Sequence, residues 1–128
     1  MTNLFRLTDK LMMKCDHAQL RFFEAREKDL TFDFFDVIKP YADDTRNELT
    51  EWKKLVFSFI EQKKPKNLYK QQIDHAIDAM EQFIVQSFYK ETSKKRFLQS
   101  IQSVRYTLTV VKQRVEEGDQ DAAKETND

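Results

Sequence analysis

The 128-residue sequence predicts an all-α fold, a single-domain up-down-up-down four-helix bundle, from three observations. Glycine occurs once, at Gly118, whereas about 7 % is usual, and this scarcity disfavours primed hairpin turns and phosphate-binding loops. Apolar side chains recur every three or four residues through four long stretches, which is the spacing of one helical face. The breaks between the stretches are short, so neighbouring helices are expected to pack antiparallel.

The first helix is expected over residues 4–28, with Leu4, Leu11, Cys15 and Phe22 on its inner face.

The second helix is expected to extend from Asp33, which can cap its start, to about Lys63, and to be kinked or broken near Pro40. Phe34 and Phe35 keep the helical spacing ahead of the proline and are therefore expected to share the inner face. A capping box at residues 45–48 leaves open a fresh helix start after the proline.

The third helix is expected from Leu68 to about Lys90, and Thr92 or Ser93 is expected to open the fourth. The fourth helix has the most regular apolar stripe, and Gly118 stands where a C-terminal cap belongs. We therefore predict a bundle over residues 1–118 and an acidic, disordered tail over 119–128. The stripe consists of Phe97, Ile101, Val104, Leu108, Val111 and Val115.

Charge gives no overall preference for a partner, because 22 basic and 22 acidic side chains cancel. Nucleic-acid-binding proteins are more often basic overall. The single Cys15 cannot form an internal disulfide, and no signal peptide or membrane-spanning run is evident. We therefore expect a cytoplasmic protein that does not enter a membrane.

The residues that carry enzymatic chemistry do not form a recognisable constellation. Neither His17 nor His75 has the Glu-x-x-His pattern of di-iron bundles, and one cysteine cannot build a zinc site. Cys15 lies on the apolar stripe and points away from His17, so we expect it to be a buried thiol. We expect no catalytic residue, no metal and no cofactor, and a protein that is not an enzyme.

Two sets of residues could form partner surfaces. Phe5, Met12 and Phe23 fall beside the main stripe of the first helix, which suggests a protein partner or a weak homodimer. Basic side chains surround the loop after the second helix and could contact an anion or nucleic acid, although solvated charges or local ion pairs are the simpler interpretation. These basic residues are Lys63, Lys64, Lys66 and Lys70.

Several short segments, in order and spacing, resemble the YppE-like family of small uncharacterised proteins from Gram-positive bacteria. The resemblance covers about residues 31–112, is weaker in the first helix, and implies an all-helical bundle with no established activity to transfer. Its segments are Asp33-Phe34-Phe35, Ile38-Lys39-Pro40, Trp52, Pro65-Lys66, Gln72-Ile73, Gln86-Ser87, Lys94-Lys95-Arg96-Phe97 and Tyr106-Thr107-Leu108.

The function expected from the sequence is a non-catalytic helical bundle that acts through protein–protein contact. Nucleic-acid binding through the loop of residues 63–70 and small-ligand binding between helices are the alternatives.

Overall fold

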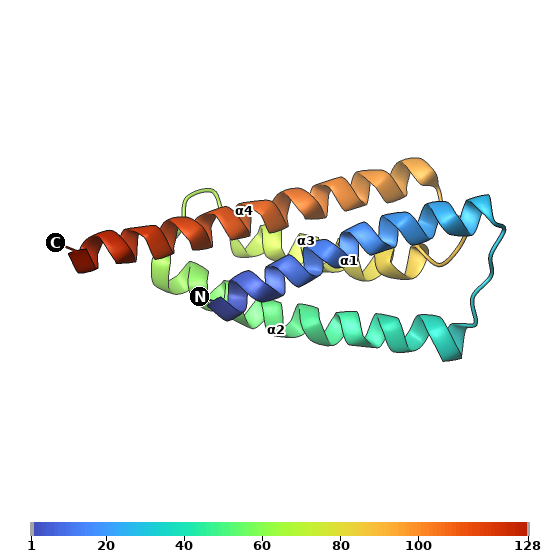
Figure 1. The fold of residues 1–128 in the computed structure, drawn as a ribbon, viewed down its shortest axis with the longest axis horizontal. Helices are drawn as coiled ribbons and strands as arrows, with labels where there is room; N and C mark the ends of the chain where they lie inside the picture. Colours follow the sequence, from blue (N-terminus) through green and yellow to red (C-terminus); the bar gives the residue numbers. More distant parts are fainter. Residues whose placement is uncertain (1, 128) are drawn as a thin grey trace.

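Four long helices run side by side along one axis in a computed structural model of the chain (Figure 1). The structure describes the backbone of residues 2–127 and the side chains of residues 3–118. The helices are α1 (Thr2–Glu27), α2 (Lys39–Lys63), α3 (Lys70–Gln86) and α4 (Lys94–Asn127), and a short π-helical turn, η1 (Phe34–Ile38), precedes α2.

Successive helices point in opposite directions, and the two chain ends lie at the same end of the molecule (Figure 1). The α2–α3 loop lies at that end too, whereas η1 and the α3–α4 connection lie at the other. The predicted all-α, up-down-up-down bundle is therefore confirmed, and the described residues contain no strand.

The core is formed by the apolar stripes that the sequence marks. All six stripe residues of α4 are buried, from Phe97 to Val115. The Phe97 ring stacks on Phe22 of α1 at 4.2 Å between centroids and meets the edge of Phe83 of α3 at 6.2 Å. One aromatic cluster thus joins three helices at the η1 end of the bundle.

One buried polar chain crosses the core between α1 and α2. The indole Nε1 of Trp52 donates to Thr8 Oγ1 at 2.9 Å, and the same hydroxyl donates to the Leu4 carbonyl at 2.7 Å. All three side chains are buried. Trp52 can be fully enclosed because its one polar atom has a partner.

The second helix is continuous through Pro40, and the disturbance predicted there takes the form of the π turn η1. The amides of Val37 and Ile38 both donate to the Asp33 carbonyl, at 3.0 and 3.2 Å. The Asp33 carboxylate accepts from the Asp36 amide at 2.7 Å and caps the turn. Proline lacks a donor and its ring crowds the carbonyl four residues earlier, and the wider π turn directly before Pro40 accommodates both.

No fresh helix start follows Pro40. Thr45 is buried in the middle of α2, and its hydroxyl donates to the Tyr41 carbonyl at 3.0 Å. The capping box that the sequence suggests at residues 45–48 is therefore not formed.

The connections turn without glycine. Asp29, Lys64 and Asn67 have positive φ angles of 54°, 46° and 58°. Asp and Asn tolerate this left-handed region better than most residues, and Lys64 uses it to end α2. A chain with one glycine can therefore still make left-handed turns in the α1–η1 and α2–α3 connections.

Two helix ends differ from those expected. Helix α3 ends at Gln86 rather than near Lys90, because the amide of Phe88 bonds back only three residues, to Val85 at 3.1 Å. Helix α4 does not end at Gly118 but continues to Asn127, so the predicted C-cap there is wrong. Gly118 has no positive φ and simply sits within the helix. The side chains of 119–128 lie outside the described residues, and disorder of that tail stays a prediction.

Candidate interaction surface

The flank of α1 predicted as a partner surface packs mostly against the chain itself. Phe5, Met12 and Phe23 are only partly exposed and contact the core. The Lys112 ammonium lies 5.0 Å from the Phe5 ring centroid, and the Lys94 ammonium 5.5 Å from that of Phe23. These three side chains belong to the contact between α1 and α4 more than to an open surface.

The basic loop is exposed, but part of its charge is already used. Lys63, Lys64, Lys66 and Lys70 all lie at the surface around the α2–α3 connection. Lys70 Nζ forms an ion pair with Glu61 at 2.6 Å.

Helix α4 also contacts this loop. Arg114 Nε donates to the Lys66 carbonyl at 2.7 Å, and Arg114 pairs with Glu117 at 3.0 Å. Glu61 of α2 and Glu117 of α4 therefore lie near this loop, and its surface is not the uniformly positive one that favours phosphate binding.

A second basic cluster surrounds the α3–α4 connection at the other end of the molecule (Figure 1) and consists of Lys90, Lys94, Lys95 and Arg96. Within this cluster, Lys90 pairs with Asp29 of the α1–η1 connection. The two clusters do not combine into one patch.

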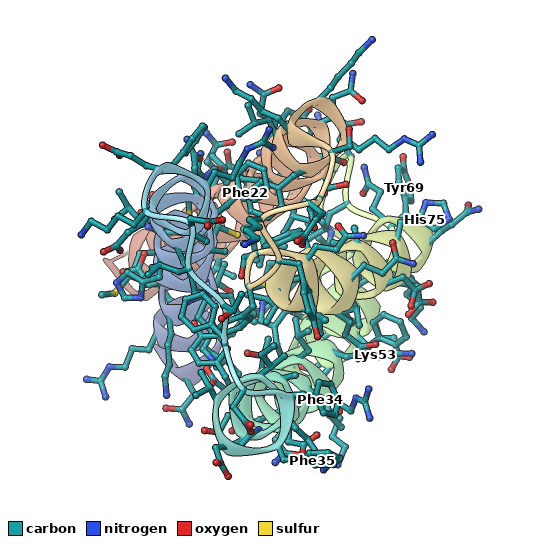
Figure 2. The ribbon with its side chains drawn as sticks, turned by 90° about the vertical axis from the view of Figure 1, so that its right-hand side faces the viewer. Phe22, Phe34, Phe35, Lys53, Tyr69 and His75 are labelled. Atoms are coloured by element: carbon teal, nitrogen blue, oxygen red, sulfur yellow. The ribbon has the colours of Figure 1, made fainter. Side chains whose placement is uncertain are left out.

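The residues considered for catalysis are separated. Cys15 is completely buried, and burial raises the pKa of its thiol to about 12, against a smaller opposing effect of Arg105. His17 and His75 are both exposed, and Figure 2 shows His75 at the outer side of α3. Among the residues that the structure describes, no group of three or more His, Cys, Asp or Glu side chains could hold a metal ion.

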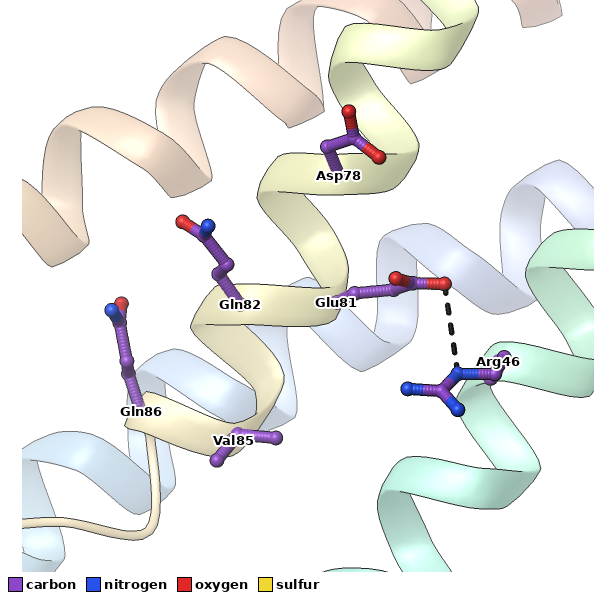
Figure 3. Close-up of a pocket in the computed structure, with 6 residues that line it drawn as sticks. All are labelled: Arg46, Asp78, Glu81, Gln82, Val85 and Gln86. Atoms are coloured by element: carbon purple, nitrogen blue, oxygen red, sulfur yellow. Dashed lines mark ion pairs between the residues drawn. The ribbon is translucent and has the colours of Figure 1, made fainter.

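A shallow groove of about 680 Å³ lies between α2 and α3 (Figure 3). Arg46 Nε and Glu81 Oε1 face each other across it at 3.9 Å. Small-ligand sites are usually enclosed and mostly apolar, so this open, polar groove does not match that type of site. Its lining residues are Arg46, Asp78, Glu81, Gln82, Val85 and Gln86.

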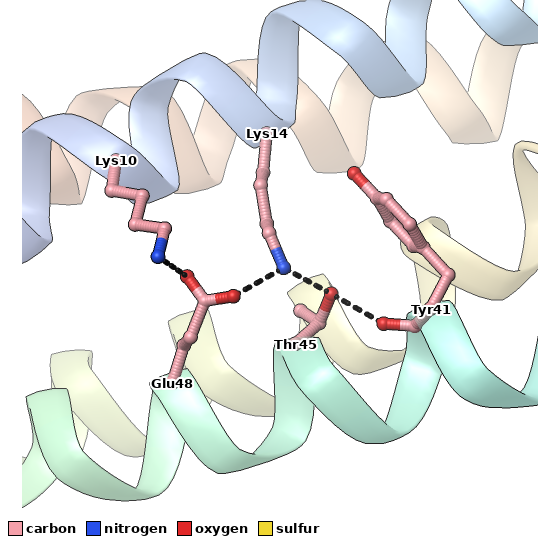
Figure 4. Close-up of polar contacts among 5 residues, drawn as sticks. All are labelled: Lys10, Lys14, Tyr41, Thr45 and Glu48. Atoms are coloured by element: carbon pink, nitrogen blue, oxygen red, sulfur yellow. Dashed lines mark hydrogen bonds and ion pairs between the residues drawn. The ribbon is translucent and has the colours of Figure 1, made fainter.

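The contact between α1 and α2 contains a polar network (Figure 4). Lys14 Nζ lies 2.6 Å from Glu48 Oε1 and donates to Thr45 Oγ1 at 2.9 Å, while Lys10 approaches the other carboxylate oxygen at 3.7 Å. Lys14 and Glu48 are only 11 % and 17 % exposed. The network therefore links α1 to α2 through partly buried polar side chains.

Arg21 continues the same contact toward η1. Its guanidinium stacks on the rings of Phe88 and Tyr41, at 4.1 and 4.7 Å, and Nε donates to Ser87 Oγ at 3.0 Å. Desolvation lowers the pKa of this guanidinium. The Phe88 ring also packs edge to face against Phe32, at 5.3 Å between ring centroids. Phe88 therefore contacts both Arg21 and the α1–η1 connection.

The most exposed apolar cluster lies on η1, and we name it the η1 face: Phe34, Phe35, Val37 and the flanking acids Asp33 and Asp36. Phe34 is 45 % exposed, Phe35 74 % and Val37 41 %. The two rings meet edge to face at 5.2 Å, and both project away from the bundle (Figure 2).

Phe34 and Phe35 begin the π turn, ahead of its one buried residue. Of its five residues only Ile38 is buried, and Ile38 therefore provides the one anchor of the turn in the core. Sequence spacing predicts that Phe34 and Phe35 share the inner face with the residues that follow, and this prediction is wrong, because both rings are exposed at the start of η1.

A small pocket of about 240 Å³ lies at the same end of the bundle, between the α1–η1 and α3–α4 connections. Phe32 and Phe88 contribute its aromatic walls, and Tyr89, 40 % exposed, lies at its edge. Apolar surface at this end is therefore not confined to η1.

These features define a class: an all-α four-helix bundle with an exposed aromatic cluster at one end and, among its described residues, no group of side chains that could hold a metal ion. A family model, a bacterial domain of unknown function (DUF1798), matches residues 8–115, and the chain belongs to this family. None of the described helices is long and apolar enough to cross a lipid bilayer.

Known relatives agree with this assignment. The uncharacterised protein YppE of Bacillus subtilis (strain 168) is 28 % identical over 112 residues, 88 % of this chain and 91 % of YppE. Its crystal structure superposes with a TM-score of 0.90 and 27 % identity, covering 93 % of this chain and 97 % of that one. A protein of unknown function from Listeria innocua superposes with a TM-score of 0.86 and 25 % identity, covering 91 % and 94 %. The resemblance to the YppE-like family is thereby confirmed, and these relatives bring no specific activity.

Proposed function

We propose that this chain is a non-catalytic, cytoplasmic protein that acts by contacting another protein, and that the η1 face is its contact surface. The observation that carries the proposal is the exposure of three large apolar side chains next to one another, Phe34, Phe35 and Val37. Contiguous exposed apolar surface is typical of interaction sites, whereas single exposed apolar residues need no explanation.

Other exposed apolar residues are more scattered. Met13 and Leu20 are 57 % and 68 % exposed on α1, but they stand seven residues apart with His17 between them. Tyr106 stands on α4. The η1 face differs because its two phenylalanine rings touch and share one short turn.

The alternatives have less support. Nucleic-acid binding would use the lysines of residues 63–70, where one lysine is paired and acidic side chains lie nearby. Small-ligand binding would use the groove between α2 and α3, which is polar and open. A salt-dependent gel shift and a thermal-shift screen would reveal either function.

The proposal is tested by affinity capture from the chain's own bacterium with three baits. They are the wild type, the double variant Phe34→Ser/Phe35→Ser, and the control Tyr106→Ser, which removes an equally exposed aromatic residue elsewhere. We expect a protein that the wild type and the control retain and the double variant loses. Identical sets of captured proteins on all three baits would contradict the η1 face as the contact surface. Unchanged far-ultraviolet circular dichroism of each bait excludes unfolding as the cause.

A further inference from the structure

The charges around the η1 face point to the chemistry of its partner. Asp33 and Asp36 stand directly before and after the aromatic pair, and Asp44 lies further along, in α2. All three are exposed, and within the described residues none of them forms an ion pair. By contrast, Asp43 between them is neutralised by Lys39 at 2.8 Å.

The acidic and apolar groups follow one line. Val37, Pro40 and Asp44 recur at helical spacing, and all three are exposed. The line therefore begins with two acids around the phenylalanine rings, continues over Val37 and Pro40, and ends at a third acid. The distance from Val37 to Asp44 is roughly 10 Å along the axis, given 1.5 Å per residue.

We propose that the η1 face binds a cationic amphipathic segment of another protein. A large apolar side chain of that segment packs against Phe34 and Phe35, and its lysine or arginine side chains stand opposite Asp33, Asp36 and Asp44. This inference rests on the proposed function and adds the chemical class of the partner.

The negative charge of the η1 face also favours a cationic segment over other kinds of partner. Phosphate-rich nucleic acids and anionic lipid surfaces are repelled by three unneutralised carboxylates. Acidic protein segments are repelled in the same way, and such like-charge repulsion is a source of partner selection. A cationic segment gains apolar contact and charge complementarity at the same place.

The test uses the full chain and three labelled 12-residue peptides in fluorescence polarisation. The first peptide is amphipathic with lysines on one face and leucines on the other, the second has glutamate in place of lysine, and the third has serine in place of leucine. We expect only the first to bind. Phe35→Ser should weaken its binding about tenfold, since a central apolar anchor dominates such contacts.

Asp36→Asn and Asp44→Asn should each weaken binding about two- to fivefold, with an effect that fades at high salt. Glu116→Gln is the matched control, because it removes one exposed carboxylate on α4 near the opposite end of the molecule. Tyr106→Ser is the control for aromatic loss. Neither control should change the affinity.

Two results separate this inference from the proposed function. If the glutamate peptide binds as well as the lysine peptide, and Phe35→Ser abolishes both, the contact surface stands and the cationic class is wrong. If no peptide binds, or Phe35→Ser leaves binding unchanged, the inference is overturned, and the capture experiment alone decides the function.

A second copy of the chain is a further outcome, because its own loop of Lys63, Lys64 and Lys66 is cationic. Light scattering over a concentration series would then show a mass that rises with concentration and returns to one chain in Phe35→Ser. That result would contradict a separate partner protein.

Discussion

Phe97 connects α1, α3 and α4 through its ring and is completely buried. Replacement of a buried phenylalanine by alanine removes apolar burial and leaves a cavity. We expect Phe97→Ala to lower the free energy of unfolding by about 3–5 kcal/mol, from a total that is about 5–15 kcal/mol for proteins of this kind. Urea unfolding measures the change.

Tyr106→Ala on the same helix is the control for this measurement, because Tyr106 is largely exposed and its loss should have little effect. Equal stability of Phe97→Ala and the wild type would mean that the inner face of α4 is misassigned.

The buried thiol of Cys15 predicts a dependence of stability on alkaline pH. Its pKa is raised to about 12 by burial, whereas an unfolded cysteine titrates near 8.5. The folded state therefore holds the proton where the unfolded state loses it. The contribution of this thiol to the free energy of unfolding is fully present below pH 8.5. It is lost as the pH rises toward 12, and the loss is roughly 2 kcal/mol at pH 10.

Cys15→Ala lacks this titration. We therefore expect the stability of the wild type to fall more steeply than that of Cys15→Ala between pH 8.5 and 10, in urea unfolding at each pH. Parallel curves of stability against pH would show that the pKa of the Cys15 thiol is the same in the folded and unfolded states. In agreement with burial, a thiol reagent should label the native protein slowly and the denatured protein quickly.

At the scale of the helices, α1 and α2 are joined through partly buried polar groups as well as apolar ones. Lys14 and Glu48 pair at 2.6 Å with little exposure. Glu48→Gln leaves the Lys14 ammonium desolvated without its counter-charge, and we expect it to destabilise the fold by about 1–3 kcal/mol. Asp74→Asn breaks the exposed pair with Lys53 and should cause no measurable change. Equal effects in thermal unfolding would show that the α1–α2 network contributes no more stability than an exposed surface ion pair.

A substitution at Gly118 tests where α4 ends. Its φ is not positive, and an added Cβ would meet only Phe59, at an ordinary 3.8 Å. Gly118→Ala should therefore raise both helicity and stability, the latter by about 0.5–1 kcal/mol. If the glycine instead ended the helix in a left-handed conformation, the same change would destabilise the protein.

The helices themselves were predictable because each buries one apolar stripe, and burial enforces the 3.6-residue period on the sequence. The stripe from Phe97 to Val115 is an example, and so is the buried position of Cys15. The π turn was not predictable from periodicity. Apolar spacing also does not report whether a side chain at the end of a helix has a neighbour to pack against, and Phe34 and Phe35 are exposed at the start of η1.

The end of α4 was missed for a different reason. A lone glycine near a helix end is compatible with a cap and with a helix interior, and the residues after Gly118 include helix formers such as Ala122 and Ala123. The candidate surface was placed on α1 because Phe5, Met12 and Phe23 lie off its main stripe. In the bundle, α4 and its lysines cover that flank.

At the scale of the whole molecule, the two ends of the bundle differ. The end with the chain termini has the basic α2–α3 loop, and the opposite end has the η1 face together with the basic residues of the α3–α4 connection (Figure 1). A weak homodimer through α1 stays a prediction: light scattering of Phe23→Glu beside the wild type would detect it, and equal masses at all concentrations would contradict it.

Photo-crosslinking in the living bacterium tests the central claim most directly, since it reports contact at a single side chain. A photoreactive phenylalanine analogue is placed at Phe35 in one strain and at Tyr106 in another. We predict that light attaches one defined protein at position 35 and that this adduct is absent from position 106. No adduct at position 35, or the same adducts at both positions, would contradict a contact function of the η1 face.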